Sequence, residues 1–60
     1  MDNIDDYRDV LRISSEMRPN ITRLKSLTSN IKTQLLLEEI ITRLDVLAGL
    51  AENEINRLEG

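Results

Sequence analysis

Cysteine, histidine, tryptophan and phenylalanine are all absent from this 60-residue sequence, which has a single tyrosine, a single proline and two glycines. Without cysteine the chain can form no disulfide, and without cysteine or histidine it lacks the usual ligands of structural zinc. The same absences exclude catalysis by a thiol or an imidazole, and no glycine-rich phosphate loop is present. We therefore predict that the protein is not an enzyme and binds no cofactor or metal.

Long apolar runs are also missing from the sequence. The longest uninterrupted one is Leu35–Leu37, far shorter than a membrane span of about 20 residues. The N-terminus is acidic, unlike that of a signal peptide. A helix lying on a membrane surface usually has a basic polar face, whereas the charged positions after residue 35 are mostly acidic. These features predict a cytoplasmic (intracellular) protein without a membrane partner.

The net charge is small, but the charged residues are unevenly distributed along the sequence. The net charge is −3, with excess acid before residue 18, four bases and no acid over residues 18–34, and excess acid again from residue 35 onward. A negative chain disfavours nucleic acid as a partner, because phosphate-binding domains are usually basic. The acidic, basic, acidic order fits a chain that folds back on itself or pairs antiparallel with a copy. The alternative is three solvated helix faces whose signs differ by chance.

Helical periodicity is the strongest signal that the sequence does contain. Leucine, isoleucine and valine make up 19 of the residues and recur at spacings of three and four. Asp2 and Asn3 are both good N-caps, and Arg57 followed by Gly60 is typical of a helix end. We predict an all-α fold, a single helical module over residues 1–60 with helical segments at about 3–17, 19–28 and 31–58. Pro19 is expected to kink or break the N-terminal arm.

The apolar stripes of the two halves point in opposite directions. At about 100° per residue, the stripe that ends at Leu35 and the stripe that begins at Leu37 differ by roughly 170°. A reversal within residues 28–34, where Thr28, Ser29 and Asn30 favour a turn, would let both stripes face each other in an antiparallel helical hairpin. The competing interpretation keeps one long helix from 19 to 58, in a parallel oligomeric coiled coil.

The two stripes supply the predicted core and self-association residues. The second stripe fills two adjacent seams, which suits a helix with more than one helical neighbour. We therefore predict that the hairpin assembles into a dimer or higher oligomer, as a helical bundle or coiled coil. The predicted residues are Val10, Ile13, Met17, Ile21, Leu24, Ile31, Leu35, Leu37, Ile40, Ile41, Leu44, Leu47, Ala48, Ala51, Ile55 and Leu58.

Small residues mark two further positions. Ala48, Gly49 and Ala51 form a patch that would let another backbone approach closely, and Gly49 requires such packing or a bend to offset its helix cost of about 1 kcal/mol. Ser14 falls near the apolar stripe and is expected to mark a small-residue contact.

Glu39 is placed to form an ion pair with Arg43 four residues later.

An acidic cluster near the N-terminus is the sharpest remaining chemical feature. Asp2, Asp5, Asp6 and Asp9 share one helix face, but acids accumulate at helix starts, and no calcium-loop pattern is present. Together with Tyr7, the acids Asp5, Asp6 and Asp9 are candidate partner-binding residues. We predict a non-enzymatic self-association and protein-interaction module. The alternative is a small acidic regulatory inhibitor, such as an antitoxin-like, co-chaperone-like or viral or phage accessory factor, that binds a basic site on a partner protein.

Overall fold

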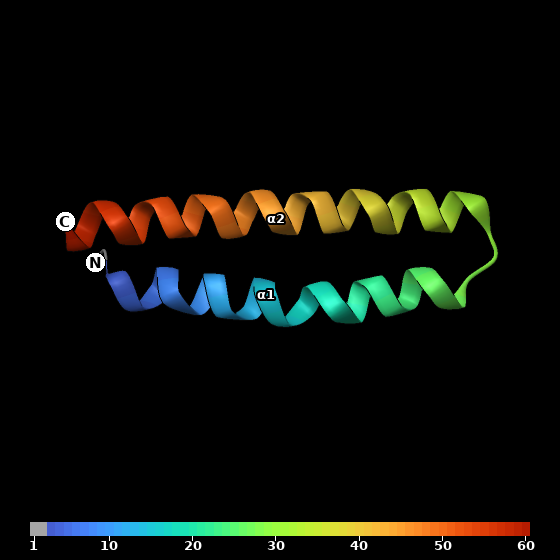
Figure 1. Cartoon of the computed structure of the whole chain (residues 1–60), viewed down its shortest axis with the longest axis horizontal. Helices are drawn as coiled ribbons and strands as arrows, with labels where there is room; N and C mark the ends of the chain where they lie inside the picture. Colours follow the sequence, from blue (N-terminus) through green and yellow to red (C-terminus); the bar gives the residue numbers. More distant parts are fainter. Residues whose placement is uncertain (1–2) are drawn as a thin grey trace.

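Two antiparallel helices form the whole fold. The computed structural model describes residues 3–60, with helix α1 at Ile4–Leu27 and helix α2 at Ile31–Glu59. The helices lie side by side along their full length, and both ends of the described chain lie at the same end of the molecule (Figure 1). The predicted all-α hairpin is confirmed.

Helix α1 begins at a side-chain cap. The Oδ1 atom of Asn3 accepts a hydrogen bond from the backbone N–H of Asp6 at 3.1 Å. Asp5 and Asp6 lie in the first turn, where negative charge interacts favourably with the helix dipole. Asn3, one of the two predicted N-caps, is therefore the N-cap of α1. The other predicted N-cap, Asp2, lies outside the described residues.

Three residues reverse the chain between the helices. Asn30 caps α2 by accepting from the backbone N–H of Thr33 at 3.0 Å, and the Gln34 side chain donates to the carbonyl of Thr28 at 2.8 Å. Thr28 itself is extended, with φ −99 and ψ 140, so it ends α1. These local hydrogen bonds compete with the helix at this point. The alternative of one long helix from 19 to 58 is therefore wrong.

Pro19 lies inside α1 and does not interrupt it. The helix is continuous from Ile4 to Leu27, so the predicted break at Pro19, with separate segments at 3–17 and 19–28, is not found. The proline ring is exposed, on the side of α1 turned away from α2. Proline has no backbone N–H, so the carbonyl four residues earlier accepts no helical hydrogen bond from it. On this exposed side of the helix, water can solvate that carbonyl instead. A kink at this residue stays a prediction.

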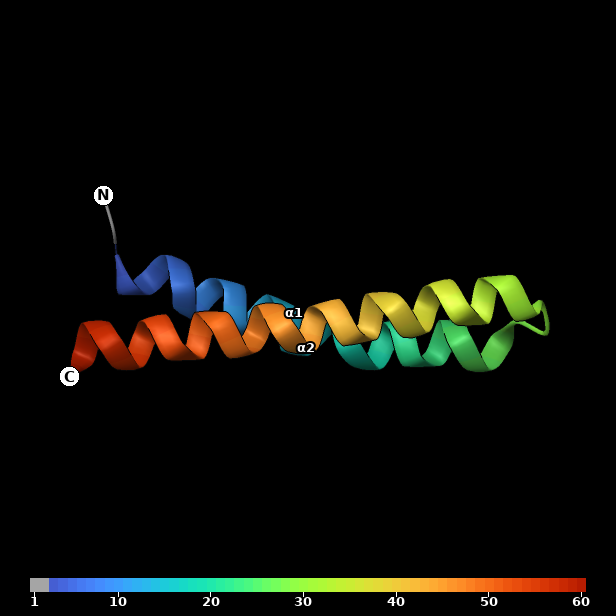
Figure 2. The ribbon, with the colours of Figure 1, turned by 90° about the horizontal axis from the view of Figure 1, so that it is seen from above.

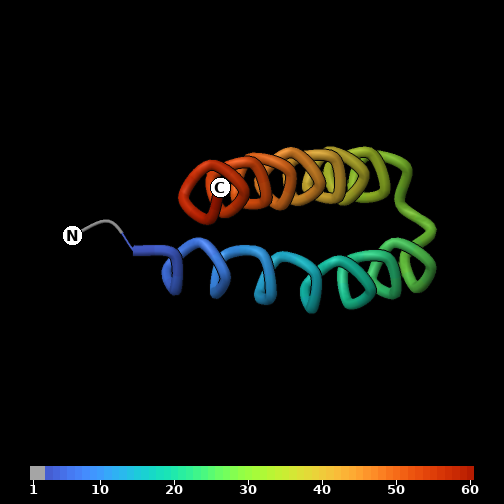
Figure 3. Tube along the Cα trace, turned by 60° about the vertical axis from the view of Figure 1, so that its left-hand side comes forward, coloured from blue at the N-terminus to red at the C-terminus, as the bar shows by residue number. Residues whose placement is uncertain are grey.

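Helix α2 ends as the sequence predicted. The backbone N–H of Gly60 donates to the carbonyl of Asn56 at 3.0 Å, and Arg57 lies in the last turn. The hairpin that results is 45 Å long and 17 by 14 Å across. Seen from above, the two helices cross near their middles rather than running parallel throughout (Figure 2), and a single short reversal joins them (Figure 3).

Gly49 is not a site of close packing within the hairpin. A Cβ atom added there would meet no atom within 4 Å, which corrects the expectation that this glycine lets a backbone approach in the single chain. The free-energy cost of a glycine inside the helix is therefore not offset by any packing contact within the hairpin. We expect Gly49→Ala to raise the free energy of unfolding by about 0.5–1 kcal/mol, measured by urea denaturation. A destabilised variant would indicate that another chain packs at Gly49.

Candidate interaction surface

The contact between the helices runs along one row of each helix. Its residues are buried or half-buried and recur at alternating spacings of three and four, apart from the exposed Arg18. This row is called the seam below. It comprises Tyr7, Leu11, Ser14, Ile21 and Lys25 from α1, Thr28 at the C-cap of α1, and Gln34, Leu37, Ile41, Leu44, Ala48, Ala51 and Ile55 from α2.

Very little of the seam is fully buried. Only Leu44, Ala51, Ile55 and Ser14 are classed as buried among the described residues, with exposed fractions between 3% and 9%. No large side chain in this part of the chain is completely enclosed. A single hairpin therefore covers only a narrow strip of its apolar surface.

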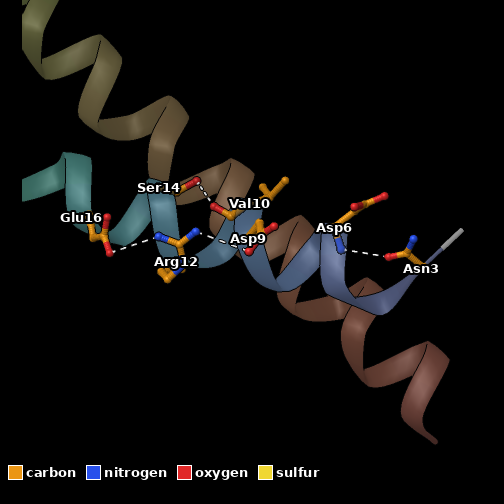
Figure 4. Close-up of polar contacts among 7 residues, drawn as sticks. All are labelled: Asn3, Asp6, Asp9, Val10, Arg12, Ser14 and Glu16. Atoms are coloured by element: carbon orange, nitrogen blue, oxygen red, sulfur yellow. Dashed lines mark hydrogen bonds and ion pairs between the residues drawn. The ribbon is translucent and has the colours of Figure 1, made fainter.

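Ser14 is the buried polar residue of the seam. It is 3% exposed, and its hydroxyl donates to the carbonyl of Val10 at 2.6 Å, so the buried polar group is satisfied within its own helix (Figure 4). The Arg18–Asp45 ion pair fixes the register, and one turn from it along each helix lie Ser14 and Ala48. Small residues thus face small residues here, which agrees with the contact expected for Ser14.

Three ion pairs cross from α1 to α2 on one side of the seam. Arg8 pairs with Glu59 at 2.6 Å, Arg18 with Asp45 at 2.8 Å, and Lys25 with Glu38 at 2.6 Å. Their reversed order confirms the antiparallel register. Their side chains are between 36% and 54% exposed, so each pair contributes about 0–1 kcal/mol. We call this side of the hairpin the polar face.

A shallow groove of about 490 Å³ lies on the polar face. Its lining includes both ends of the Arg18–Asp45 and Lys25–Glu38 ion pairs. The hydrogen bond and the negative charge of Asp45 raise the pKa of Arg18 above its ordinary value, so this guanidinium stays charged. Because these four charges already pair with one another, the groove presents no free charge to a ligand.

The opposite side of the hairpin is apolar and uncovered. Because the ion pairs place one flank of both helices on the polar face, the other flanks of both helices share the reverse face. Six large hydrophobic side chains lie there, each between 38% and 51% exposed. This set is called the apolar face: Ile13, Met17 and Leu24 from α1, and Ile40, Leu47 and Leu58 from α2.

The structure separates the predicted core residues into two groups. Within one chain, Leu44, Ala51 and Ile55 are buried, and Val10, Ile21, Leu37, Ile41 and Ala48 are half-buried. The others are exposed: Ile13, Met17, Leu24, Ile31, Leu35, Ile40, Leu47 and Leu58. The stripe expected to face α2 from α1 is thus turned away by roughly 70°, at about 100° per residue.

Some seam residues were absent from the predicted set. Leu11, Lys25 and Gln34 are half-buried in the seam, although two of them are polar. The signal that could have found them is the alternating three- and four-residue spacing that starts at Tyr7 and passes through Leu11 and Ser14. In the sequence this row is masked by the more apolar row on the same helix.

The candidate partner-binding acids are exposed and partly neutralised. Asp5 pairs with Arg8 at 3.6 Å, and Asp9 pairs with Arg12 at 3.4 Å. Figure 4 shows Arg12 between Asp9 and Glu16, bonded to both. Asp6 is exposed, and Tyr7 is half-buried at the end of the seam. Among residues 3–60, no three acids are grouped closely enough to hold a metal ion.

Two local ion pairs on α2 follow helix spacing. The predicted Glu39–Arg43 pair is confirmed, at 2.9 Å. Arg57 donates to Glu54 at 2.6 Å, and this hydrogen bond lowers the pKa of Glu54 below its ordinary value. A lowered carboxyl pKa stabilises the fold above the unfolded-state pKa, and this contribution is lost as the pH falls through the folded-state pKa.

Comparisons with known proteins do not indicate a function for this chain. No protein-family model matches this sequence, and no curated protein or solved structure matches it significantly. Neither described helix is long and apolar enough to cross a membrane.

Proposed function

We propose that this protein is a non-enzymatic self-association and protein-interaction module of the cytoplasm. In this proposal the apolar face of one hairpin packs against the apolar face of a second copy, giving a bundle of four helices. The observation that carries the proposal is the imbalance of burial: three hydrophobic residues are buried, whereas twelve large ones are exposed among the described residues.

The energetics of a small hairpin support this assembly. A single core below about 70 residues rarely supplies more than roughly 3–5 kcal/mol of stability. Complete burial of a Leu or Ile side chain contributes about 1.5–3 kcal/mol. Covering the half-exposed side chains of the apolar face on two chains would therefore add stability comparable to that of the hairpin alone. Monomeric proteins rarely expose a contiguous apolar patch of this kind without a partner for it.

The seam favours coiled-coil packing within each hairpin. Its alternating three- and four-residue spacing is the heptad pattern of helices that interlock their side chains. Heptad packing leaves the flanking positions accessible, and on the apolar face those positions are Met17, Leu24, Ile40 and Leu47. A second pair of helices can then add to the same bundle at similar crossing angles.

Sedimentation equilibrium at micromolar concentration tests the proposal. We expect a particle of twice the mass of one chain. The midpoint of thermal unfolding, followed by circular dichroism, should rise with protein concentration, because association stabilises the folded state by mass action. A folded particle with the mass of one chain, and an unfolding midpoint that is independent of concentration, would contradict self-association.

The acidic regulatory inhibitor remains a second candidate function. The exposed carboxylates of Asp5, Asp6 and Asp9 support it, and the Asp5–Arg8 and Asp9–Arg12 pairs count against it because they reduce the net negative charge. Binding of a basic partner through these acids would weaken steeply between low and moderate ionic strength. Binding through the apolar face would tolerate salt.

A further inference from the structure

Charge is distributed unevenly along the length of the hairpin. The half that contains the loop, residues 18–42, carries four bases and two acids. The half that contains the chain ends, residues 3–17 and 43–60, carries eight acids and four bases. The folded chain is therefore basic at the loop end and acidic at the open end, over a length of 45 Å.

Some of the basic side chains at the loop end form no ion pair. Within residues 3–60, Arg23 and Lys32 make no ion pair, and both belong to the loop half. Arg23 is exposed and lies on the side of α1 turned away from α2. Asp9, Glu16 and Arg23 are spaced by seven residues, so they follow one line along α1. Asp9 and Arg23 are thus equidistant from Glu16, which lies near the middle of α1.

We propose that two copies pack with their apolar faces together and their loops at opposite ends. This orientation rests on the proposed self-association and specifies the partner as a second copy in the antiparallel sense. A two-fold axis perpendicular to the helices, at the level of Glu16, places Asp9 of one copy at the level of Arg23 of the other, twice in each dimer. It also brings the two Glu16 residues to the same level, so two oppositely charged pairs outnumber one like-charged pair. It also places the basic loop end of each copy against the acidic open end of its partner.

The opposite orientation is electrostatically unfavourable. With both loops at the same end, the two acidic halves lie side by side, and so do the two basic halves. Asp9 would then lie at the level of Glu54 of the second copy, because the Arg18–Asp45 pair fixes the register between α1 and α2. Like charges placed together across an interface select against that arrangement.

Spin labels measure the orientation directly. The chain contains no cysteine, so Ser29→Cys creates a unique labelling site in the loop. Ser29 is exposed, and its side chain makes no hydrogen bond or ion pair within residues 3–60 that the label would break. Pulsed electron–electron resonance on the dimer should give a distance close to the 45 Å length of the hairpin. Labels within roughly two helix diameters, about 20 Å, would show the loops at the same end and overturn the proposal.

Charge reversal provides an independent test. Arg23→Glu should weaken the dimer about 5- to 30-fold, because it replaces two attractive pairs by two repulsive ones. Adding Asp9→Arg to the same chain should restore most of the affinity, since both pairs become attractive again. The matched control is Glu52→Arg, an exposed acid on the flank of α2 that belongs to the polar face. This control should change the dissociation constant less than twofold.

The outcomes distinguish the orientation from self-association itself. A dimer with distant loop labels and rescue by the double substitution supports both proposals. A dimer with close loop labels, or with no rescue, contradicts the orientation and leaves self-association intact. A monomer in sedimentation equilibrium contradicts self-association, and the orientation proposal falls with it.

Discussion

The Leu44→Asp variant is expected to lose its helical circular-dichroism signal at 25 °C. Leu44 is 9% exposed and lies in the centre of the seam on α2. Removing a buried leucine side chain costs about 2–5 kcal/mol, and placing a carboxylate in the same apolar site adds a desolvation cost of several more. Because a hairpin of this size has only a few kcal/mol of stability, the variant should be unfolded under conditions in which the parent chain is helical.

The neighbouring Val46→Asp substitution provides the control for this prediction. Val46 is 57% exposed and points away from both α1 and the apolar face. It introduces the same charge two residues later in the same helix, so any loss from helix propensity or added negative charge is shared. We expect Val46→Asp to remain fully helical. If Leu44→Asp kept the same helical signal as Val46→Asp, the seam would not be the core of the hairpin.

The Leu47→Asp variant is expected to dissociate the dimer. Leu47 lies on the apolar face, 44% exposed in the single chain, and at the level of Glu16 along the hairpin. A two-fold axis at that level would bring Leu47 of both copies into the centre of the interface, where binding energy concentrates. Loss of two half-exposed leucines and burial of two carboxylates should raise the dissociation constant roughly 10²- to 10³-fold, measured by analytical ultracentrifugation.

Comparison with Val46→Asp makes the result specific to the apolar face. The two substitutions are adjacent in sequence and place the same carboxylate at positions about 100° apart around α2, one on the apolar face and one off it. Val46→Asp should retain the parent dissociation constant within about twofold. Equal dissociation by both variants would show that negative charge on α2, rather than the apolar face, controls association. No change with Leu47→Asp would place the interface elsewhere or remove it.

The two leucine variants also separate folding from assembly. From the sequence alone, Leu44 and Leu47 belong to one wide stripe, and a charge at either position is expected to abolish helicity and association together. The structure places Leu44 between the helices and Leu47 outside them. Leu44→Asp should therefore destroy both properties, whereas Leu47→Asp should leave a monomer that is less stable than the parent dimer but still helical.

The sequence determined the local features of this protein. The caps at Asn3 and Asn30, the polar residues of the loop and the Glu39–Arg43 pair all depend on neighbours within about four positions. Such contacts are encoded by spacing, so the all-α fold and the reversal between residues 27 and 31 follow from it. The phase difference between the two apolar stripes was sufficient to favour a hairpin over a long helix.

Only the tertiary structure decided how α1 is rotated against α2. Helical periodicity fixes the angles between residues of one helix, but it does not say which of two adjacent rows faces the partner. That choice depends on size matching between the facing rows, here Ser14 against the alanines of α2, and on the ion pairs Arg8–Glu59, Arg18–Asp45 and Lys25–Glu38. A row containing Ser14 and Lys25 packs inward for these reasons, and the more apolar row with Ile13, Met17 and Leu24 is left at the surface.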